Sequence, residues 1–329
     1  MTDQSGRPPA PAKRRRPARA SGIGPYVRKY GAAGALGLLV VIASVTTENF
    51  LEVQNITNVL RQISIVGVLA LGMTFVIITA GIDLSVGAML TVVVVYTADT
   101  VQTMGVVPAI AVALAMGAFL GLLNGLGVTL GGVQPFVMTL GMMAFAKGIS
   151  LLYTQGRPIP ITNEAFLQFG SGRTLGIPNP ALVFLILLII AWVVLQHSVF
   201  GRSVYAVGAN EEAARLSGIP VKRVKCSVYV ISGVMAGVAG ILYASQLGVG
   251  TPVAGDGYEL DAIAATVVGG TSLFGGLGTV GGTFIGAALL GVLSNLLNLT
   301  GVSPYAQNLF SGMLIVAAVM LQRRNAQGR

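Results

Sequence analysis

The sequence predicts an all-α protein, a polytopic transmembrane helix bundle of about ten spans, some of them short or broken. Hydrophobic residues make up 54% of the 329-residue chain and charged residues only 9%, whereas a soluble globular protein carries about 25% charged residues. A helix needs about 20 apolar residues to cross a bilayer, and ten apolar stretches reach or approach that length. The expected spans are Tyr30 to Thr46, Asn58 to Ala80, Leu84 to Thr97, Val106 to Val128, Pro135 to Tyr153, Asn179 to His197, Val224 to Leu247, Glu259 to Gly270, Thr279 to Leu299 and Pro304 to Leu321.

Residues 1–29 are predicted to be a disordered basic cytoplasmic tail. The first 20 residues hold four prolines and six Lys or Arg with almost no large apolar side chain, so they cannot bury enough surface to fold. A cleaved signal peptide is not expected, because the first apolar stretch, Gly31 to Val45, leads into another spanning segment where a signal peptide would have a small-residue cleavage site. A membrane-spanning domain is expected over residues 30–322, and residues 323–329 are expected to form a cytoplasmic C-terminal tail.

The formal charge of +9 at first suggests a nucleic-acid partner, but the positions of the basic residues favour a membrane protein. The 20 Lys and Arg lie mainly at the ends of apolar stretches. Membrane lipid is therefore expected as a partner, and nucleic acid is not. With the N-terminus inside, 16 of the 20 fall on the cytoplasmic face: eight before the first span, five between residues 202 and 225, and three after residue 321. A multi-pass protein of a bacterial inner membrane, with both termini cytoplasmic, follows.

Small residues indicate close helix packing. The third and eighth expected spans, starting at Leu84 and Glu259, are shorter than a bilayer crossing and rich in small residues, so they are expected to be broken or re-entrant and packed inside protein. Glycines recur every four residues, which lets neighbouring helix backbones approach each other. These glycines are Gly117, Gly121, Gly125, Gly233, Gly237, Gly278, Gly282 and Gly286. By contrast, the glycine-free stretch 181–195 suits a peripheral helix that faces lipid.

The segment 198–223 is predicted to be a cytoplasmic loop that holds one helix of about two turns. Asn210 is a good N-cap, Glu211 and Glu212 complement the positive helix start, and Gly218 followed by Pro220 ends it. A helix of two turns is only marginally stable alone in water, so a contact with another part of the protein or with a partner must stabilise it. Its sequence resembles the EAA loop of ATP-binding cassette importers, the short helix that enters a groove on the ATPase subunit; a capped connector is the alternative. The candidate residues for coupling this loop to the ATPase subunit are Asn210, Glu211, Glu212, Ala213, Ala214 and Gly218.

Polar side chains within spans are candidates for a translocation pathway or gate. Asp83 ends a long apolar run, where a carboxylate is costly without partners; the structural alternative is that it caps the next helix by accepting from amides near Ser85 and Val86. Lys147 is an intramembrane charge, whose stem alternatively reaches the outer interface. The candidate pathway residues are Asp83, Ser85, Asn124, Lys147, Asn295 and Asn298, and several of them are expected only to bridge helices.

Three segments together carry a resemblance to a known family. GMTFVIITAGIDLSVGAML at 72–90, the 201–246 region and VVGGTSLFGGLGTVGG at 267–282 resemble the permeases of ribose-type monosaccharide importers of the ATP-binding cassette class. The resemblance runs from about Asn58 to the C-terminus and leaves out the N-terminal tail. It implies a second permease subunit, identical or a paralogue, an ATP-binding cassette ATPase on the cytoplasmic face, and an extracytoplasmic sugar-binding protein. The long outer connection 154–178 is a candidate docking surface for that protein, with Arg157, Glu164 and Arg173.

Enzymatic functions are disfavoured, and no cofactor or metal is expected. The chain has no GxxxxGK[ST] loop, so ATP hydrolysis would belong to a partner. Its one histidine, His197, has no nearby cysteine or acidic residue with which to build a metal site or a triad. The expected substrate is a monosaccharide such as ribose, xylose, arabinose or galactose. Alternatives are another small polar ligand, such as an amino acid or a furanone-like signal, or a secondary transporter that works without ATP.

Overall fold

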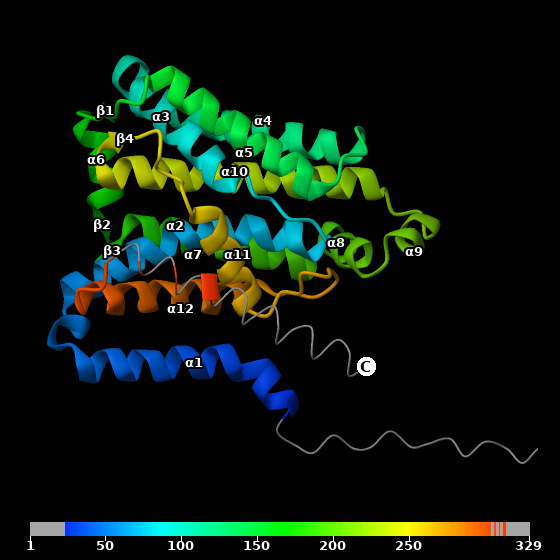
Figure 1. Cartoon of the computed structure of the whole chain (residues 1–329), viewed down its shortest axis with the longest axis horizontal. Coiled ribbons are helices and arrows are strands. Elements are labelled where there is room, and N and C mark those ends of the chain that lie inside the picture. The colour runs from blue at the N-terminus through cyan, green and yellow to red at the C-terminus, as the bar shows by residue number, and fades with distance from the viewer. Residues whose placement is uncertain (1–23, 304–305, 307–308, 310–311, 314–329) are drawn as a thin grey trace, which may run out of the picture. The chain divides into compact units, whose positions relative to one another are not determined.

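The structure, a computed structural model, describes residues 24–303, 306, 309 and 312–313 (Figure 1). The chain divides after Gly31 into two units, and the second, beginning at Ala32, holds every element after α1. The expected last span, Pro304 to Leu321, lies mostly outside the described residues, and the predicted C-terminal tail lies wholly outside them. Of the predicted N-terminal tail, residues 1–23 are outside the described part, and α1 begins at Gly24. The helices are α1 Gly24–Thr46, η1 Glu48–Leu51, α2 Val53–Ile78, α3 Val86–Met104, α4 Val106–Thr129, α5 Pro135–Thr154, α6 Glu164–Ser171, α7 Asn179–His197, α8 Val199–Ala209, α9 Glu211–Leu216, α10 Val221–Leu247, α11 Tyr258–Val268 and α12 Val280–Leu299.

The prediction of an all-α polytopic bundle is confirmed. Seven of the described helices, α2, α3, α4, α5, α7, α10 and α12, are long and apolar enough to cross a membrane, and the part of α1 from Gly31 to Thr46 is a shorter apolar helix. In the described residues, strands are limited to four of two residues each, paired antiparallel as β1 Ile159–Pro160 with β4 Val249–Gly250 and β2 Arg173–Thr174 with β3 Ile177–Pro178.

One of the two expected short spans is short and the other is not. α11 has 11 residues and is followed by a non-helical segment, 269–279. α3, however, has 19 residues, so the prediction that the third span is too short is wrong. The polar run from Tyr96 to Met104 continues the helix. The hydroxyls of Thr100 and Thr103 donate hydrogen bonds to backbone carbonyls one turn earlier, so these polar groups are paired without ending the helix. The irregular part instead precedes α3, at residues 79–85.

The predicted glycine contacts join α4 to α10. A Cβ atom at Gly117 would overlap the carbonyl oxygen of Gly233, and one at Gly121 would overlap the carbonyl oxygen of Tyr229. The two backbones therefore touch, and only glycine allows this approach. The same relation joins α12 to α11, where a Cβ atom at Gly286 would overlap the carbonyl oxygen of Ala265.

α7 covers the bundle with one face and leaves the other open, as its composition predicts. Phe184 and Leu195 are buried, whereas Ile186 and Ile189 are more than half exposed. Phe184 lies against Gly67 of α2, whose missing side chain makes room for the ring. An exposed row of large aliphatic side chains on a 19-residue apolar helix suits contact with lipid.

The second unit has two ends, and α10 runs from one to the other. The segments that connect the helices differ between these ends. α9 directly precedes the first turn of α10, and α8 lies at the same end (Figure 1). At the other end α6 packs on the last turns of α10, where Gly170 lies against the backbone of Ser245, and both strand pairs lie beside it. Five basic residues, Arg202, Arg215, Lys222, Arg223 and Lys225, belong to the α8–α9 end.

Candidate functional site

The short helix predicted in the 198–223 loop is present as α9. The Asn210 side chain accepts a hydrogen bond from the Ala213 amide at 2.9 Å, so it caps the helix. Gly218, with φ of 81°, ends the helix in the left-handed region that favours glycine. The local prediction is therefore confirmed, whereas α8, which immediately precedes it, was not expected.

α9 presents nearly all of its surface to solvent. Ala214 is buried and faces the bundle, while the other residues from Asn210 to Gly218 are exposed, including Leu216 at 76%. A helix of six residues gains little from its own hydrogen bonds, so it depends on its cap and on the Ala214 contact.

Ion pairs fix the orientation of the charged side chains on α9. Glu212 accepts from Arg215 Nε at 3.0 Å and from Nη2 at 2.6 Å, and Glu211 pairs with Lys225 in the first turns of α10. The hydrogen bonds that Arg215 donates to Glu212 raise the pKa of its guanidinium above its already high value, so this guanidinium stays positively charged at any physiological pH. The Glu211–Lys225 pair ties α9 to α10, the helix that runs through the bundle.

Asp83, Ser85 and Asn124 come together in one buried network. Asp83 is fully buried and its carboxylate accepts from the Ser85 amide at 3.0 Å, from the Ser85 hydroxyl at 2.6 Å and from the Ser232 hydroxyl at 2.9 Å. Asn124 donates to the Ser85 hydroxyl at 2.8 Å. Ser232 lies 11 residues after the start of α10, roughly 16 Å along it, so the network lies deep in the bundle.

The structural alternative for Asp83 is therefore partly confirmed. Its carboxylate holds the turn before α3 by accepting from the Ser85 amide, although Ser85, rather than Asp83, is the N-cap of the helix. The other bonds tie this turn to α4 and α10. Each of the oxygens faces a hydroxyl or amide donor, which is how a buried carboxylate is stabilised without a basic neighbour.

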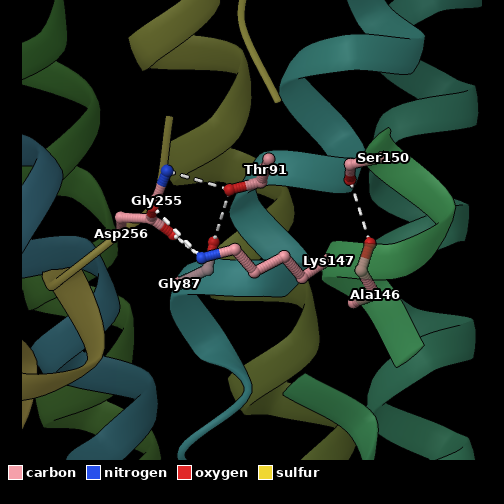
Figure 2. A network of polar contacts seen from close by, with 7 residues as sticks. All are labelled: Gly87, Thr91, Ala146, Lys147, Ser150, Gly255 and Asp256. Atoms are coloured by element: carbon pink, nitrogen blue, oxygen red, sulfur yellow. Dashed lines mark hydrogen bonds and ion pairs between the residues drawn. The ribbon is translucent and has the colours of Figure 1, made fainter. Parts of the chain in front are cut away.

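Lys147 pairs with an acidic residue of another segment. Its ammonium lies 2.9 Å from Asp256 Oδ1 and 3.2 Å from Oδ2. Figure 2 shows the side chain extending from α5 past Gly87 and Thr91 of α3 to Asp256. Asp256 belongs to the non-helical segment 251–257, which leads into α11, and about half of each side chain remains exposed.

Asn295 and Asn298 lie apart from these two groups. The amides of Asn295 on α12 and Asn55 on α2 exchange two hydrogen bonds, at 2.7 and 3.0 Å, and Asn55 also donates to the Phe50 carbonyl. Both side chains are buried, so the pair bridges two helices. Asn298, one turn further along α12, is exposed.

The predicted docking residues lie at the α6 end of the bundle, and all three are exposed. Glu164 is in the first turn of α6, whose N-cap Asn163 accepts from the Phe166 amide at 3.1 Å. Arg173 in β2 donates to the Gln54 side chain at 3.4 Å, and Arg157 lies in the turn before β1. The glycines and prolines of this loop do interrupt it, but α6 and both strand pairs give it a defined structure that composition did not predict.

Asp256, Ser232 and Thr91 were not predicted as members of these groups. A lone Lys within a span requires a carboxylate within reach, and the glycine-rich PVAGDGYEL segment before the shortest span offered one in Asp256. Nothing in the sequence pairs Ser232 with Asp83 or places Thr91 beside residue 255. Within the part of the chain that the structure describes, no group of three or more His, Cys, Asp or Glu could hold a metal ion.

Comparison with known proteins identifies the family. Residues 55–319 match the family described as branched-chain amino acid transport system / permease component. The chain belongs to this permease family. It is 46% identical over 304 residues to the "Ribose import permease protein RbsC" of Bacillus subtilis (strain 168), covering 91% of this permease and 94% of that relative.

Two further relatives extend this similarity. The "Ribose import permease protein RbsC" of Escherichia coli (strain K12) is 45% identical over 295 residues, which are 88% of this permease and 92% of the relative. The "D-allose transport system permease protein AlsC" of the same strain is 39% identical over 299 residues, covering 90% and 91%. No solved structure matches the chain. This permease is thus a multi-pass membrane protein, and the resemblance read from its three motifs is confirmed.

Proposed function

We propose that this permease forms the translocation pathway of an ATP-driven importer for a monosaccharide such as ribose, xylose, arabinose or galactose. The observation that carries the proposal is α9: a capped, exposed helix at the basic end of the bundle, tied through Glu211 to α10. Similarity to ribose and allose permeases over nine-tenths of the chain supports a sugar as substrate. As a permease component, this subunit leaves ATP hydrolysis to a separate ATPase subunit.

The two alternative functions have less support. The family description names amino acid transport, but the relatives at 39–46% identity are named for ribose and allose, which favours a sugar over an amino acid or a furanone-like signal. A secondary transporter would not need an exposed coupling helix. A relative of 37% identity is named "Probable ABC transporter permease protein YphD", which favours coupling to an ATPase.

The end of the bundle that carries α9 is proposed to be cytoplasmic. Five basic residues gather there between residues 202 and 225, and loops rich in Lys and Arg stay inside. Both termini are then cytoplasmic, and the α6 end faces outward. Exposed Arg157, Glu164 and Arg173 on that outer end are suited to a sugar-binding protein that delivers the solute.

A second permease subunit, a copy or a paralogue, is proposed to complete the pathway. α4 and α5 leave most of their apolar surface uncovered, with Phe119 and Phe145 more than half exposed. Unlike α7, α5 also carries an exposed charge, Lys147. A face that combines large apolar side chains with a charge suits contact with protein and water better than contact with lipid alone. The permease domain over residues 30–322, with its coupling loop 198–223, is thus proposed to act as one half of a pair.

Uptake by the reconstituted complex tests the coupling role. Gly218→Pro cannot keep a φ of 81°, and Glu212→Lys reverses a charge on the exposed face of α9; both are expected to abolish ATP-dependent sugar uptake while the protein elutes as a single species. Gly132→Pro is the matched control, because Gly132 in the turn between α4 and α5 has a φ of 66° and open space around it, as at Gly218. Normal uptake by both α9 variants would refute the coupling role.

A further inference from the structure

The Lys147–Asp256 pair lies within the apolar length of the bundle. Lys147 is seven residues before the end of α5, about 10 Å below it, in a helix long and apolar enough to span a membrane. The pair still keeps 47% of the Lys147 side chain and 54% of the Asp256 side chain exposed. Half-exposed charges at this depth are costly against hydrocarbon, so this face is expected to border water or protein.

The two charges are held by separate elements. Lys147 is on a regular helix, whereas Asp256 lies between Gly255 and Gly257, and Gly257 has a φ of 90°. The Gly255 amide donates to the Thr91 hydroxyl at 2.8 Å, and a Cβ atom at Gly255 would overlap the carbonyl oxygen of Gly87 (Figure 2). The backbone beside Asp256 is thus anchored on α3, so the carboxylate is placed by α3 and the ammonium by α5.

The space beside the pair is open. Gly148, next to Lys147, and Gly141, almost two turns earlier, have no atom within 4 Å of the position where a Cβ would stand, and Ala144 between them is exposed. Gly141, Ala144 and Gly148 therefore keep part of the exposed α5 surface near the lysine free of large side chains. Such a face leaves room for a solute beside the charges, whereas larger side chains would cover them.

The bonding capacity of the pair matches a neutral polyol. An ammonium has three donors and a carboxylate about four acceptor sites, so the two bonds between them leave donors and acceptors free on the exposed side. Neighbouring hydroxyl groups of a sugar both donate and accept, and can bond to both partners at once.

From these observations we propose that Lys147 and Asp256 line the water-filled translocation pathway and hydrogen-bond to the sugar as it passes. The proposal rests on the proposed function and adds a contact site for the substrate to it. The competing explanation is a structural tie between α5 and the segment before α11. That explanation requires neither access to water nor any effect of the pair on the apparent affinity for sugar.

Thiol labelling tests access to water. The chain has a single cysteine, so Cys226→Ala provides a cysteine-free background. In the assembled transporter in membranes, Lys147→Cys and Asp256→Cys are expected to react with a charged, membrane-impermeant methanethiosulfonate at least about tenfold faster than Ile189→Cys on the exposed face of α7. Saturating sugar-loaded binding protein with ATP is expected to slow the reaction at both positions. Labelling no faster than at Ile189→Cys would overturn the proposal.

Transport kinetics test contact with the sugar. Lys147→Met keeps the length of the side chain without its donors, and Asp256→Asn keeps the shape of the carboxylate without its charge. Each is expected to raise the KM for sugar uptake by about tenfold, with a smaller effect on the maximal rate of ATP hydrolysis. The exchanged pair Lys147→Asp with Asp256→Lys is expected to recover much of this loss.

The outcomes distinguish a pathway site from a structural tie and from a failure of the proposed function. An unchanged KM in both single variants, with a lowered unfolding temperature in detergent, would identify a structural tie and overturn the proposal. If the wild-type complex with its ATPase and binding protein transports no monosaccharide, the proposed function itself fails. If the wild type transports and the labelling and KM results are both negative, only the pathway site is wrong.

Discussion

Replacing Asn210 with alanine removes the only side-chain cap of α9. The Asn210 carboxamide accepts from the Ala213 amide, and losing such a cap costs a helix about 1 kcal/mol. α9 has six residues, so it has almost no other helical hydrogen bonding with which to offset that loss. If the ATPase subunit binds only the folded helix, 1 kcal/mol weakens that binding about fivefold. Titration of the purified ATPase onto the permease in lipid nanodiscs measures this constant.

The chain offers a matched control at its other end. Asn163 caps α6 in the same way, by accepting from the Phe166 amide, so Asn163→Ala removes an equivalent bond on the proposed outer face. ATPase binding is expected to be unchanged in Asn163→Ala and weakened in Asn210→Ala. Equal affinity in both variants and the wild type, or a larger loss in Asn163→Ala, would refute the assignment of α9 as the ATPase contact.

Two further predictions concern stability, measured as the unfolding temperature in detergent. Gly286→Ala is expected to destabilise the permease by about 1–3 kcal/mol because its methyl group would overlap the Ala265 carbonyl oxygen, whereas Gly281→Ala in the same helix meets open space and is expected to be neutral or slightly stabilising. Asn55→Leu and Asn295→Leu are each expected to cost about 1–3 kcal/mol because the remaining buried amide loses both hydrogen bonds to its partner. The double variant is expected to cost less than the two single costs added together.

Local chemistry explains why α9 was predictable and the distant partners of the turn before α3 were not. The α9 signals are all within nine residues: a cap, two acidic residues in the first turn, and a glycine that needs a positive φ. The turn before α3 depends instead on Ser232, which is 149 residues away from Asp83 along the chain. The sequence shows that a carboxylate at this position requires partners, but it does not show which helix supplies them.

The same difference applies to the pathway candidates. Lys147 was recognised because a charge in a span is unusual, but its partner lies 109 residues away in a segment without regular structure. Asn295 carried a similar polar signal and proves to be one half of an amide pair with Asn55, 240 residues away. The polarity of a side chain within a span is visible in the sequence, whereas the tertiary contact decides whether it bridges two helices or faces water.

The Asp83 network and the Lys147–Asp256 pair differ in a way that bears on their roles. Asp83 is fully buried and accepts hydrogen bonds from Ser232 of α10 and from its own turn. Asn124 of α4 donates to Ser85 in the same turn, and the glycine contacts also hold α4 against α10. This part of the molecule has little freedom for one helix to slide past another, so a force on α9 is expected to move α4 and α10 together. The Lys147–Asp256 pair is half exposed, and its two hydrogen bonds join α5 to a glycine-flanked segment. Hydrogen bonds to water or to a solute can replace these two bonds. A change in pathway width during transport is therefore expected at this pair, and the Asp83 network is expected to stay intact.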